Sequence, residues 1–348
     1  MQFNKVCLES ISCHLPQNVV PSTDLEKRLA PVYEKLKLPY GRLEMMSGIR
    51  ERRFWNNGVY PSEISSVAGE KAIEKSGLDR SEIGCLICAS VCRDFLEPAT
   101  ASVIHHNLKL PQEAMLFDVS NACLGVLNGM VIIANMIELG QIRAGLVVAG
   151  ENGGPLIDNT IETLLADPNV NRSNIKTSFA SLTIGSGAAA VLLTHRDFSK
   201  SQHKLLGGEA WAATQFNDLC RGNADSGMDS ESTPLMETDA ETLMKHGCRL
   251  AGETWEKTRI ALKWDNDAVD RVFCHQVGIM HRKLLYETLG LPLEKDFSTL
   301  EFLGNTGAAS LPATLALGEE AGCLAKGNKA ALLGIGSGLN CLMLGVEW

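Results

Sequence analysis

Cys123 has the sequence setting that most strongly suggests covalent chemistry. It follows a strand-like run at 115–119 and a turn of small residues, and it precedes an apolar segment at 124–139 that we expect to form a buried helix. A thiol at a helix N-terminus feels the positive end of the helix dipole and unpaired N–H groups, which both favour the thiolate. The sequence therefore predicts a nucleophile with a lowered pKa, although a buried cysteine acting as a small hydrophobe is the alternative.

His275 and Asn305 are two further candidates. His275 ends a strand-like run at 269–274, and open α/β sheets place their ligand sites at the carboxyl ends of strands. Asn305 opens a Gly-Asn-Thr-Gly turn before an apolar helix at 311–324. Taken alone, the first fits a hydrogen-bonded structural histidine and the second a turn former. Their interpretation depends on whether the fold brings them to Cys123.

An internal duplication supplies that fold. The order helix, strand, small-residue turn, helix, strand, Gly-Ser-Gly and strand occurs twice, and Ile-Gly-Ser-Gly recurs at 184–187 and 335–338. We expect α/β halves at 1–195 and 196–348, with parallel sheets packed about a pseudo-two-fold axis. The turns of Cys123 and Asn305 then face each other, and an insertion at about 152–177 caps the site.

The helices and strands expected in the two halves follow the same sequence of types. In the first half they lie at 64–75, 83–90, 115–119, 124–139, 145–149 and 188–193, and in the second at 240–262, 269–274, 311–324, 330–333 and 341–346.

Composition is that of a soluble globular protein. The 348 residues are 45% hydrophobic and 21% charged, and the net charge of −9 argues against a general nucleic-acid binder. The N-terminus lacks a signal-peptide pattern. The longest apolar segment is short for a bilayer span and carries Asn128, Asn135 and Glu138. We therefore expect a cytoplasmic protein without a transmembrane segment.

Two short motifs suggest metal or nucleotide binding but fit it poorly. Cys85 and Cys88 have a metal-like spacing, but they fall in the strand-like run 83–90, on opposite faces, and no second Cys or His pair completes a site. Gly334 and Gly336 precede a strand, whereas a dinucleotide loop precedes a helix. We expect free thiols, no metal and no cofactor.

Three motifs resemble those of the thiolase superfamily, in the branch that contains β-ketoacyl-acyl-carrier-protein synthase III. They are Asn-Ala-Cys-Leu-Gly around Cys123, His275-Gln, and Gly-Asn-Thr-Gly-Ala-Ala-Ser around Asn305; Ser47-Gly-Ile-Arg-Glu-Arg-Arg is similar as well. The resemblance spans nearly the whole chain. It implies a thiolase-like fold of duplicated βαβαβαββ halves in α-β-α-β-α layers. It also implies acylation of Cys123, then carbon–carbon bond formation, with His275 and Asn305 holding an enolate oxygen.

Differences from the synthase III motifs indicate which activity within this branch the chain has. Those enzymes usually carry Asn where this chain has Gly278, and a basic residue that docks the carrier protein where it has Met280. The segment Arg-Asp-Phe-Leu-Glu-Pro-Ala-Thr-Ala instead resembles the acyl-CoA condensing enzymes of bacterial olefin synthesis, whose glutamate in this loop reaches the partner subunit's active site. Glu97 matches that glutamate. The ending Gly-Ile-Gly-Ser-Gly-Leu-Asn is similar too, and implies an oxyanion hole built from the N–H groups of Ser337 and Cys123.

The source of the carbanion separates the two activities. A malonyl donor forms it by losing CO2, whereas a plain acyl thioester must lose an α-proton and needs a base. Phe95, Leu96 and Pro98 give Glu97 apolar neighbours that would raise its pKa and suit it to that role. The alternative is a loop carboxylate in solvent.

Arg50, Arg52 and Arg53 form the densest basic cluster in the first half. At least one is expected to bind the phosphates of coenzyme A. The alternative is an exposed turn paired with Glu51.

The sequence thus predicts a homodimeric enzyme that condenses two fatty acyl-CoA molecules without decarboxylation into a 2-alkyl-3-ketoacyl product. A decarboxylative synthase III is the alternative. A catalytically silent scaffold is disfavoured, because the Cys, His and Asn set is complete. Enzymes of later lipid-pathway steps are expected partners.

Overall fold

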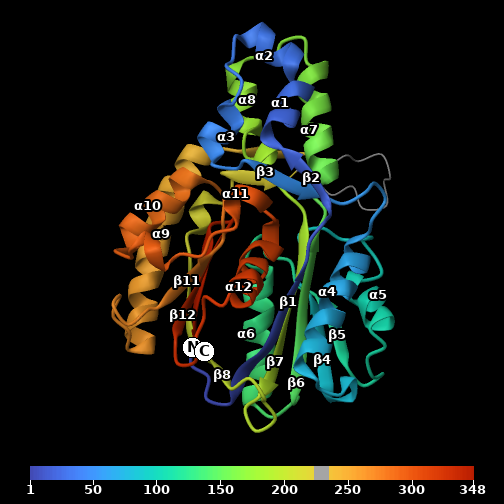
Figure 1. Ribbon diagram of the computed structural model, residues 1–348, viewed down its shortest axis with the longest axis vertical. Helices are drawn as coiled ribbons and strands as arrows, with labels where there is room; N and C mark the ends of the chain where they lie inside the picture. Colours follow the sequence, from blue (N-terminus) through green and yellow to red (C-terminus); the bar gives the residue numbers. More distant parts are fainter. Residues whose placement is uncertain (223–234) are drawn as a thin grey trace.

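The computed structural model describes residues 1–222 and 235–348 (Figure 1). Helices and strands alternate along the chain. The helices are α1 (Ser22–Arg28), α2 (Ala30–Leu36), α3 (Arg42–Ser47), α4 (Pro61–Ser76), α5 (Thr100–Asn107), α6 (Gly125–Glu138), α7 (Gly154–Ala166), α8 (Arg172–Ser178), α9 (Ala240–Leu262), α10 (Ile279–Leu289), α11 (Leu300–Leu303) and α12 (Ser310–Glu320). The strands are β1 (Val6–His14), β2 (Asn18–Pro21), β3 (Glu51–Phe54), β4 (Ile83–Cys88), β5 (Met115–Asp118), β6 (Ala144–Glu151), β7 (Gly187–His195), β8 (His203–Ala212), β9 (Cys220–Gly222), β10 (Met236–Thr238), β11 (Arg271–Cys274), β12 (Lys329–Gly336) and β13 (Asn340–Glu347).

The predicted duplication is visible in the strand order. The large sheet runs β11-β12-β13-β8-β1-β7-β6-β4-β5, so each half reads outward from the centre in the same way: β1, β7, β6, β4 in the first and β8, β13, β12, β11 in the second. The halves are not separate sheets as expected, because β1 and β8 pair at Cys7 and Leu8 and join them. The boundary between residues 195 and 196 falls just after β7 and stays a prediction.

The sheet is mixed, whereas parallel sheets were expected. Pairs β4–β5, β4–β6 and β11–β12 are parallel, but β6–β7 and β12–β13 are antiparallel. For β12 and β13 the reason is the length of their connection. Only three residues, 337–339, join β12 to β13, and a parallel crossover needs a dozen or more.

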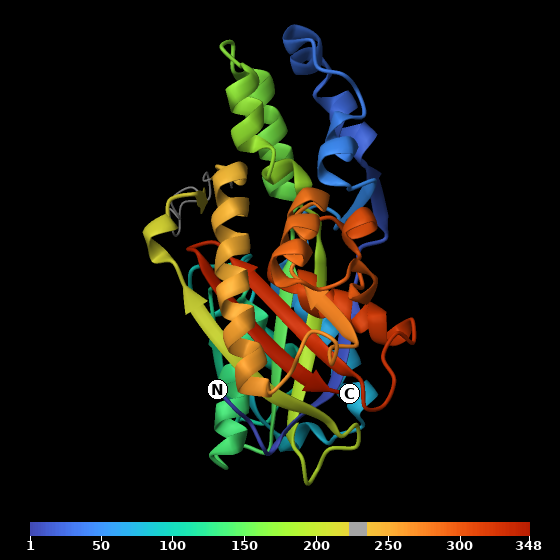
Figure 2. The same cartoon turned by 90° about the vertical axis from the view of Figure 1, so that its left-hand side faces the viewer.

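The layers confirm the predicted α-β-α-β-α arrangement. Helices α6 and α12 lie between the two halves of the sheet, with α4 and α5 outside the first half and α9 and α10 outside the second (Figures 1 and 2). The largest apolar cluster combines side chains of both central helices with strands of both halves. Cys85 belongs to this cluster and Cys88 to a separate one, so the two thiols do face opposite sides of β4.

The start of α6 is set by a close approach. A Cβ on Gly125 would lie 2.2 Å from the carbonyl oxygen of Ala89, so only glycine lets the helix begin against the end of the neighbouring strand. This contact holds the residues just before α6 at the carboxyl edge of the first half-sheet. Cys123 is one of them.

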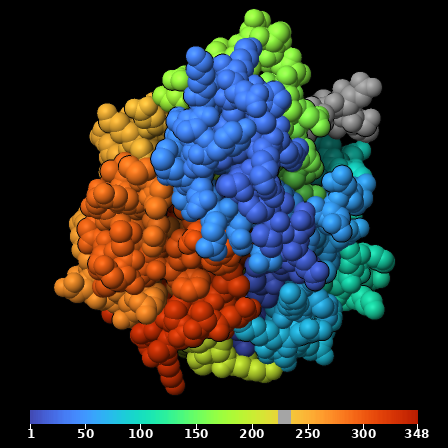
Figure 3. Space-filling model, turned by 45° about the horizontal axis from the view of Figure 1, so that its top comes forward, coloured from blue at the N-terminus to red at the C-terminus, as the bar shows by residue number. Residues whose placement is uncertain are grey.

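A helical cap covers one end of the layers (Figure 3). The predicted insertion forms half of it, as α7 and α8, and the N-terminal helices α1, α2 and α3, which the sequence did not indicate, form the rest. An apolar cluster, centred on Leu25, Leu29, Ile157 and Ile161, packs the two parts together. Within the described residues, no helix is long and apolar enough to cross a membrane.

Candidate active site

A cavity of about 1120 Å³ lies where the two halves and the cap meet. Its lining includes Cys123, His275, Asn305 and Ser337, so the structure brings together the residues predicted from three separate motifs and the glycine-rich ending. The site therefore includes the turns that precede α6 and α12, the two turns that the pseudo-symmetry predicted to face each other.

Cys123 lies in a tight turn two residues before α6. Ala122 has a φ of 46°, in the left-handed region, and the N–H of Leu124 donates to the Asn121 carbonyl (3.0 Å). The thiol pKa is not lowered as predicted. Burial raises it to about 12, and the nearby carboxylate of Glu151 adds to the effect. Desolvation of the thiolate in this enclosed site outweighs the favourable field of the helix.

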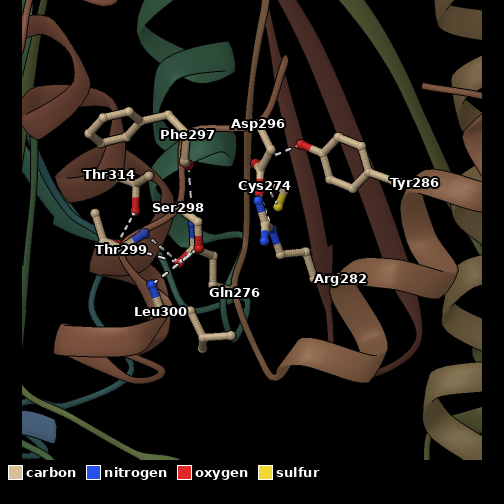
Figure 4. Close-up of polar contacts among 10 residues, drawn as sticks. All are labelled: Cys274, Gln276, Arg282, Tyr286, Asp296, Phe297, Ser298, Thr299, Leu300 and Thr314. Atoms are coloured by element: carbon tan, nitrogen blue, oxygen red, sulfur yellow. Dashed lines mark hydrogen bonds and ion pairs between the residues drawn. The ribbon is translucent and has the colours of Figure 1, made fainter. Parts of the chain in front are cut away.

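Two polar networks hold Cys274 and Gln276 (Figure 4), which are the sequence neighbours of His275. Before it, the thiol of Cys274 contacts Asp296, a buried carboxylate that also pairs with Arg282 and accepts from the Tyr286 hydroxyl (2.6 Å). The backbone N–H of His275 donates to the Leu333 carbonyl (3.0 Å). The His275 backbone thus holds the end of β11 to β12, and Asp296 links Cys274 to the side chains of α10.

The second network follows His275. The Gln276 amide oxygen accepts from the N–H of Thr299 (3.0 Å), and its nitrogen donates to the Phe297 carbonyl (3.3 Å) (Figure 4). Thr299 in turn shares a hydrogen bond with Thr314 on α12 (2.7 Å). The histidine backbone therefore has little freedom to shift.

His275 is a neutral imidazole. Burial lowers its pKa to about 3, with a smaller contribution from His281, whose own pKa burial lowers to about 4. Among the described residues, the buried Nδ1 of His275 has no hydrogen-bond partner. A neutral ring can donate one N–H and accept at its other nitrogen.

Asn305 is oriented by its own turn. Its side-chain oxygen accepts from the N–H of Gly307 (3.0 Å), and its backbone pairs with Thr183 (3.0 Å) and Gly185 (2.9 Å) from the first half. With the oxygen turned to the backbone, the amide NH2 is the group left to donate to a bound molecule.

Ser337 lies in the loop between β12 and β13, and a pair of asparagines joins this loop to the turn of Cys123. Asn340 donates to the Ser337 carbonyl (2.9 Å), and Asn121 donates to the Asn340 side-chain oxygen (3.1 Å). Asn121 also donates to Asn128 on α6 (2.7 Å). The two backbone segments predicted to form the oxyanion hole are therefore tied to each other.

Glu151 is a functional candidate that the sequence analysis missed. It ends β6, its side chain is buried, and it lines the cavity with Cys123. The only indication of this residue in the sequence is a single carboxylate at the end of an apolar strand.

Glu97 is exposed and does not line the cavity of its own chain. Its neighbours Phe95 and Leu96 are about half exposed as well, so the apolar setting expected for Glu97 is not formed within one chain. Glu97 can therefore take the predicted role only in the active site of a second subunit.

The structure does not bring Arg50, Arg52 or Arg53 to the cavity. Arg50 is exposed and pairs with Glu301 (2.9 Å). Arg52 is fully buried, and burial lowers its pKa to about 10. Arg53 donates to the Pro16 carbonyl (3.0 Å). Strand β3 alternates these side chains between faces, which a charge count cannot show.

Other cations line the cavity on its cap side. These are Lys37, Arg42, Arg172 and Lys176, from the end of α2, from α3 and from α8. Lys176 pairs with Glu241 (3.1 Å), and Arg172 donates to the Leu36 carbonyl (3.3 Å). Lys37 and Arg42 are close in sequence, as are Arg172 and Lys176, but the two pairs lie far apart along the chain and the cap brings them to one cavity.

Family models match three parts of the chain: the N-terminal domain of thiolase over residues 49–156, 3-oxoacyl-[acyl-carrier-protein] synthase III over 117–210, and the synthase III C-terminal domain over 261–348. The chain is 43% identical over 351 residues to the acyl-CoA:acyl-CoA alkyltransferase of Shewanella oneidensis, with 100% of both chains covered. It is 36% identical over 348 residues to the Xanthomonas campestris alkyltransferase, again with 100% of both covered. The chain belongs to the acyl-CoA:acyl-CoA alkyltransferase family.

Solved structures of this family agree with that assignment. Cerulenin-bound OleA of Xanthomonas campestris matches with a TM-score of 0.94 at 36% identity, over 100% of this chain and 98% of that one. OleA with bound lauric acid and lauroyl-CoA matches with a TM-score of 0.93 at 35% identity, over 99% and 100%. A β-ketoacyl-acyl-carrier-protein synthase III of Koribacter versatilis is 25% identical over 352 residues, covering 98% of this chain and 97% of its own. The predicted thiolase-like fold is confirmed, and the alkyltransferase family lies nearer than that synthase.

Proposed function

We propose that this enzyme joins two fatty acyl-CoA molecules by a Claisen condensation without decarboxylation. The observation that carries the proposal is the meeting of Cys123, His275 and Asn305 in one cavity with largely apolar walls, in a chain of the alkyltransferase family. A cavity of about 1120 Å³ exceeds the usual range for small-ligand pockets, which suits long acyl chains.

In the first half-reaction the Cys123 sulfur attacks the thioester carbonyl. The thiol starts protonated, because burial raises its pKa, and it must lose that proton as the carbon–sulfur bond forms. His275 is a neutral ring in the same cavity, so one of its nitrogens can accept this proton as the bond forms and pass it to the sulfur of the departing coenzyme A. The N–H groups of Cys123 and Ser337 would then stabilise the oxyanion, and coenzyme A leaves.

In the second half-reaction a base removes the α-proton of the second acyl-CoA. The N–H of His275 and the NH2 of Asn305 would hold the resulting enolate oxygen. The enolate carbon attacks the acyl-enzyme carbonyl, the new carbon–carbon bond forms, and the Cys123 thiolate departs.

The base proposed is Glu97 of the partner subunit in a homodimer. The loop that carries it exposes Val91 (49%), Phe95 (47%) and Leu96 (54%), and the neighbouring edge strand β5 exposes Met115 (48%). An apolar loop beside an open sheet edge is a surface that a second copy can cover. Enclosure there would place the carboxylate in a drier setting and raise its basicity.

Coenzyme A is proposed to bind at the cap side of the cavity. Arg42 and Arg172 suit its phosphates because guanidinium groups bind them in a bidentate manner. Replacing both with Gln is expected to raise the KM for acyl-CoA several-fold with little change in kcat. Replacing Arg50, which lies outside the cavity, is the matched control. A cytoplasmic location and transfer of the product to later lipid-pathway enzymes complete the proposal.

Product mass spectrometry with acyl-CoA as the only substrate tests the reaction. We expect a 2-alkyl-3-ketoacyl product and no CO2 release from the condensation itself. The Glu97→Gln variant should release one burst of coenzyme A and then stop, because loss of a general base slows the second half-reaction by about 10²–10⁴-fold. Strict dependence on malonyl thioester would identify a decarboxylative synthase instead.

A further inference from the structure

Glu151 makes an unusual set of hydrogen bonds for a buried carboxylate. Its Oε1 accepts from the backbone N–H groups of Val91 (2.8 Å) and Ala308 (3.2 Å), and its Oε2 accepts from that of Cys92 (3.1 Å). The side chain is 4% exposed, and its own backbone carbonyl accepts from the Trp55 indole (3.1 Å). Burial raises the pKa of Glu151, but all of these partners are donors and favour the ionised carboxylate.

These bonds make Glu151 a poor general base. Three backbone N–H groups already donate to its two oxygens, and such bonds stabilise the ionised form and lower its basicity. Its place in the cavity therefore needs another explanation.

The three amides belong to two segments that the proposed mechanism uses. Val91 and Cys92 begin the Glu97 loop, residues 91–99, and Ala308 belongs to the Asn305 turn, residues 304–309. The fit at the turn is tight, because a Cβ on Gly307 would lie 3.2 Å from the Glu151 carboxyl carbon. A single carboxylate thus joins a loop of the first half to a turn of the second.

We propose that Glu151 is a positioning residue of the condensation step, whose carboxylate fixes the root of the Glu97 loop against the Asn305 turn. This rests on the proposed function. Within one subunit, Glu151 holds in place the enolate-binding Asn305 and, through the loop, the base that this subunit presents to its partner. Its effect falls on the second half-reaction, since Glu151 bonds to no part of the Cys123 turn or the Ser337 loop in the described structure.

The principal test is Glu151→Gln, read out on each half-reaction separately. The Gln amide has nearly the same shape as the carboxylate. One accepting oxygen becomes an NH2 group, however, so a donor then faces the donor of a backbone N–H. We expect the first burst of coenzyme A to stay within about twofold of wild type, and condensation to fall by about 10²-fold, the effect of a displacement near 1 Å. Glu9→Gln is the matched control, because Glu9 is a buried carboxylate that accepts from the N–H of Lys200 (2.9 Å) far from the cavity.

A second readout separates positioning from general damage to the fold. Removing the negative charge of Glu151 should shift alkylation of Cys123 to lower pH, because that charge helps to raise the thiol pKa. Glu151→Asp keeps the charge but is one methylene shorter, so it should leave the alkylation profile in place and still slow condensation. Glu151→Asp therefore also serves if Glu151→Gln folds poorly.

Wild-type condensation in both Glu151→Gln and Glu151→Asp would overturn the inference. So would equal losses in both half-reactions with a matching fall in melting temperature, since that pattern describes structural damage. The proposed function fails on a different result, namely full condensation by Glu97→Gln or a requirement for malonyl thioester. In a double variant of Glu97 and Glu151 we expect less than the product of the two single effects, because both act on the same step.

Discussion

At the scale of single residues, the site begins its chemistry from neutral groups. Cys123 is a thiol and His275 a neutral imidazole, because burial disfavours the charged form of each. An ion pair of thiolate and imidazolium, the resting state of many cysteine nucleophiles, is not what this cavity favours. Activation must come with substrate, when the proton can move as the bond forms.

Alkylation of Cys123 by iodoacetamide should therefore increase with pH far above neutrality. The thiolate is the reactive form, and with a pKa of about 12 its fraction keeps rising through pH 10. This reverses the expectation from the helix position alone, which was rapid labelling at neutral pH. Peptide mapping across a pH series measures it. A rate for Cys123 that levels off near pH 7 would contradict the raised pKa.

The buried histidines predict acid sensitivity of the fold. His275 and His281 have folded pKa values of about 3 and about 4, below the ordinary 6.5, so the unfolded chain takes up protons first as the pH falls. Their stabilising effect is complete above about pH 6.5 and is lost progressively below it. Each should lower the free energy of unfolding by about 1.4 kcal/mol per pH unit in that range.

Urea unfolding between pH 6.5 and 5 measures this slope. The variant His281→Gln removes one of the two groups, so its slope should be shallower by about 1.4 kcal/mol per pH unit, whatever its stability at pH 7. Parallel stability curves for variant and wild type would show that His281 does not titrate in this way.

The sequence could predict the functional residues that belong to a recognisable motif, but not those whose role depends on contacts with distant parts of the chain. Cys123, His275 and Asn305 each follow a strand or open a helix, and pattern alone located them. Glu151 ends a strand as well, but its partners lie about 60 and 157 positions away, and nothing local reveals them. Arg50, Arg52 and Arg53 do not line the cavity, and the sequence could not show this, because the density of charge along a chain does not tell where the side chains point.

At the scale of elements, strongly periodic segments were predicted well and short ones were missed. The helix expected at 240–262 is α9 (Ala240–Leu262), and the helix expected at 64–75 is α4 (Pro61–Ser76), which ends at the left-handed cap Gly77 (φ 61°). Helices α1, α2 and α3 have six or seven residues each, with mixed polarity. Their stability comes from packing on α7 and α8, which sequence periodicity does not encode.

The link between the Cys123 turn and the β12–β13 loop gives an element-scale prediction. Asn340→Ala removes the bond to the Ser337 carbonyl and the contact with Asn121, so the Ser337 N–H should lose its alignment. We expect the first release of coenzyme A to slow by about tenfold, less than the loss of an oxyanion donor itself. Rapid-quench measurement of the first turnover tests it. Asn328→Ala, which alters a surface turn, is the control, and equal rates in both variants would exclude the alignment role.

At the scale of the whole molecule, the proposed sharing of Glu97 makes activity a property of two chains. Glu97→Gln and Cys123→Ala homodimers should both be nearly inactive. Random mixing by coexpression should restore roughly a quarter of wild-type activity, because half of the dimers are mixed and each of those has one complete site of two. Purification through two different tags isolates the mixed dimer. Its inactivity would argue that Glu97 serves the site of its own chain.

The position of β1 has a consequence for biosynthesis. This first strand lies in the middle of the sheet, and its neighbours β7 and β8 begin at Gly187 and His203. A ribosome adding 5–20 residues per second needs roughly 10–40 s to produce them, and during that time the apolar strand has no neighbour to pair with. Pairings so distant in sequence also form slowly. We therefore expect the nascent chain to depend on chaperones that shield its first residues until the second half begins to emerge.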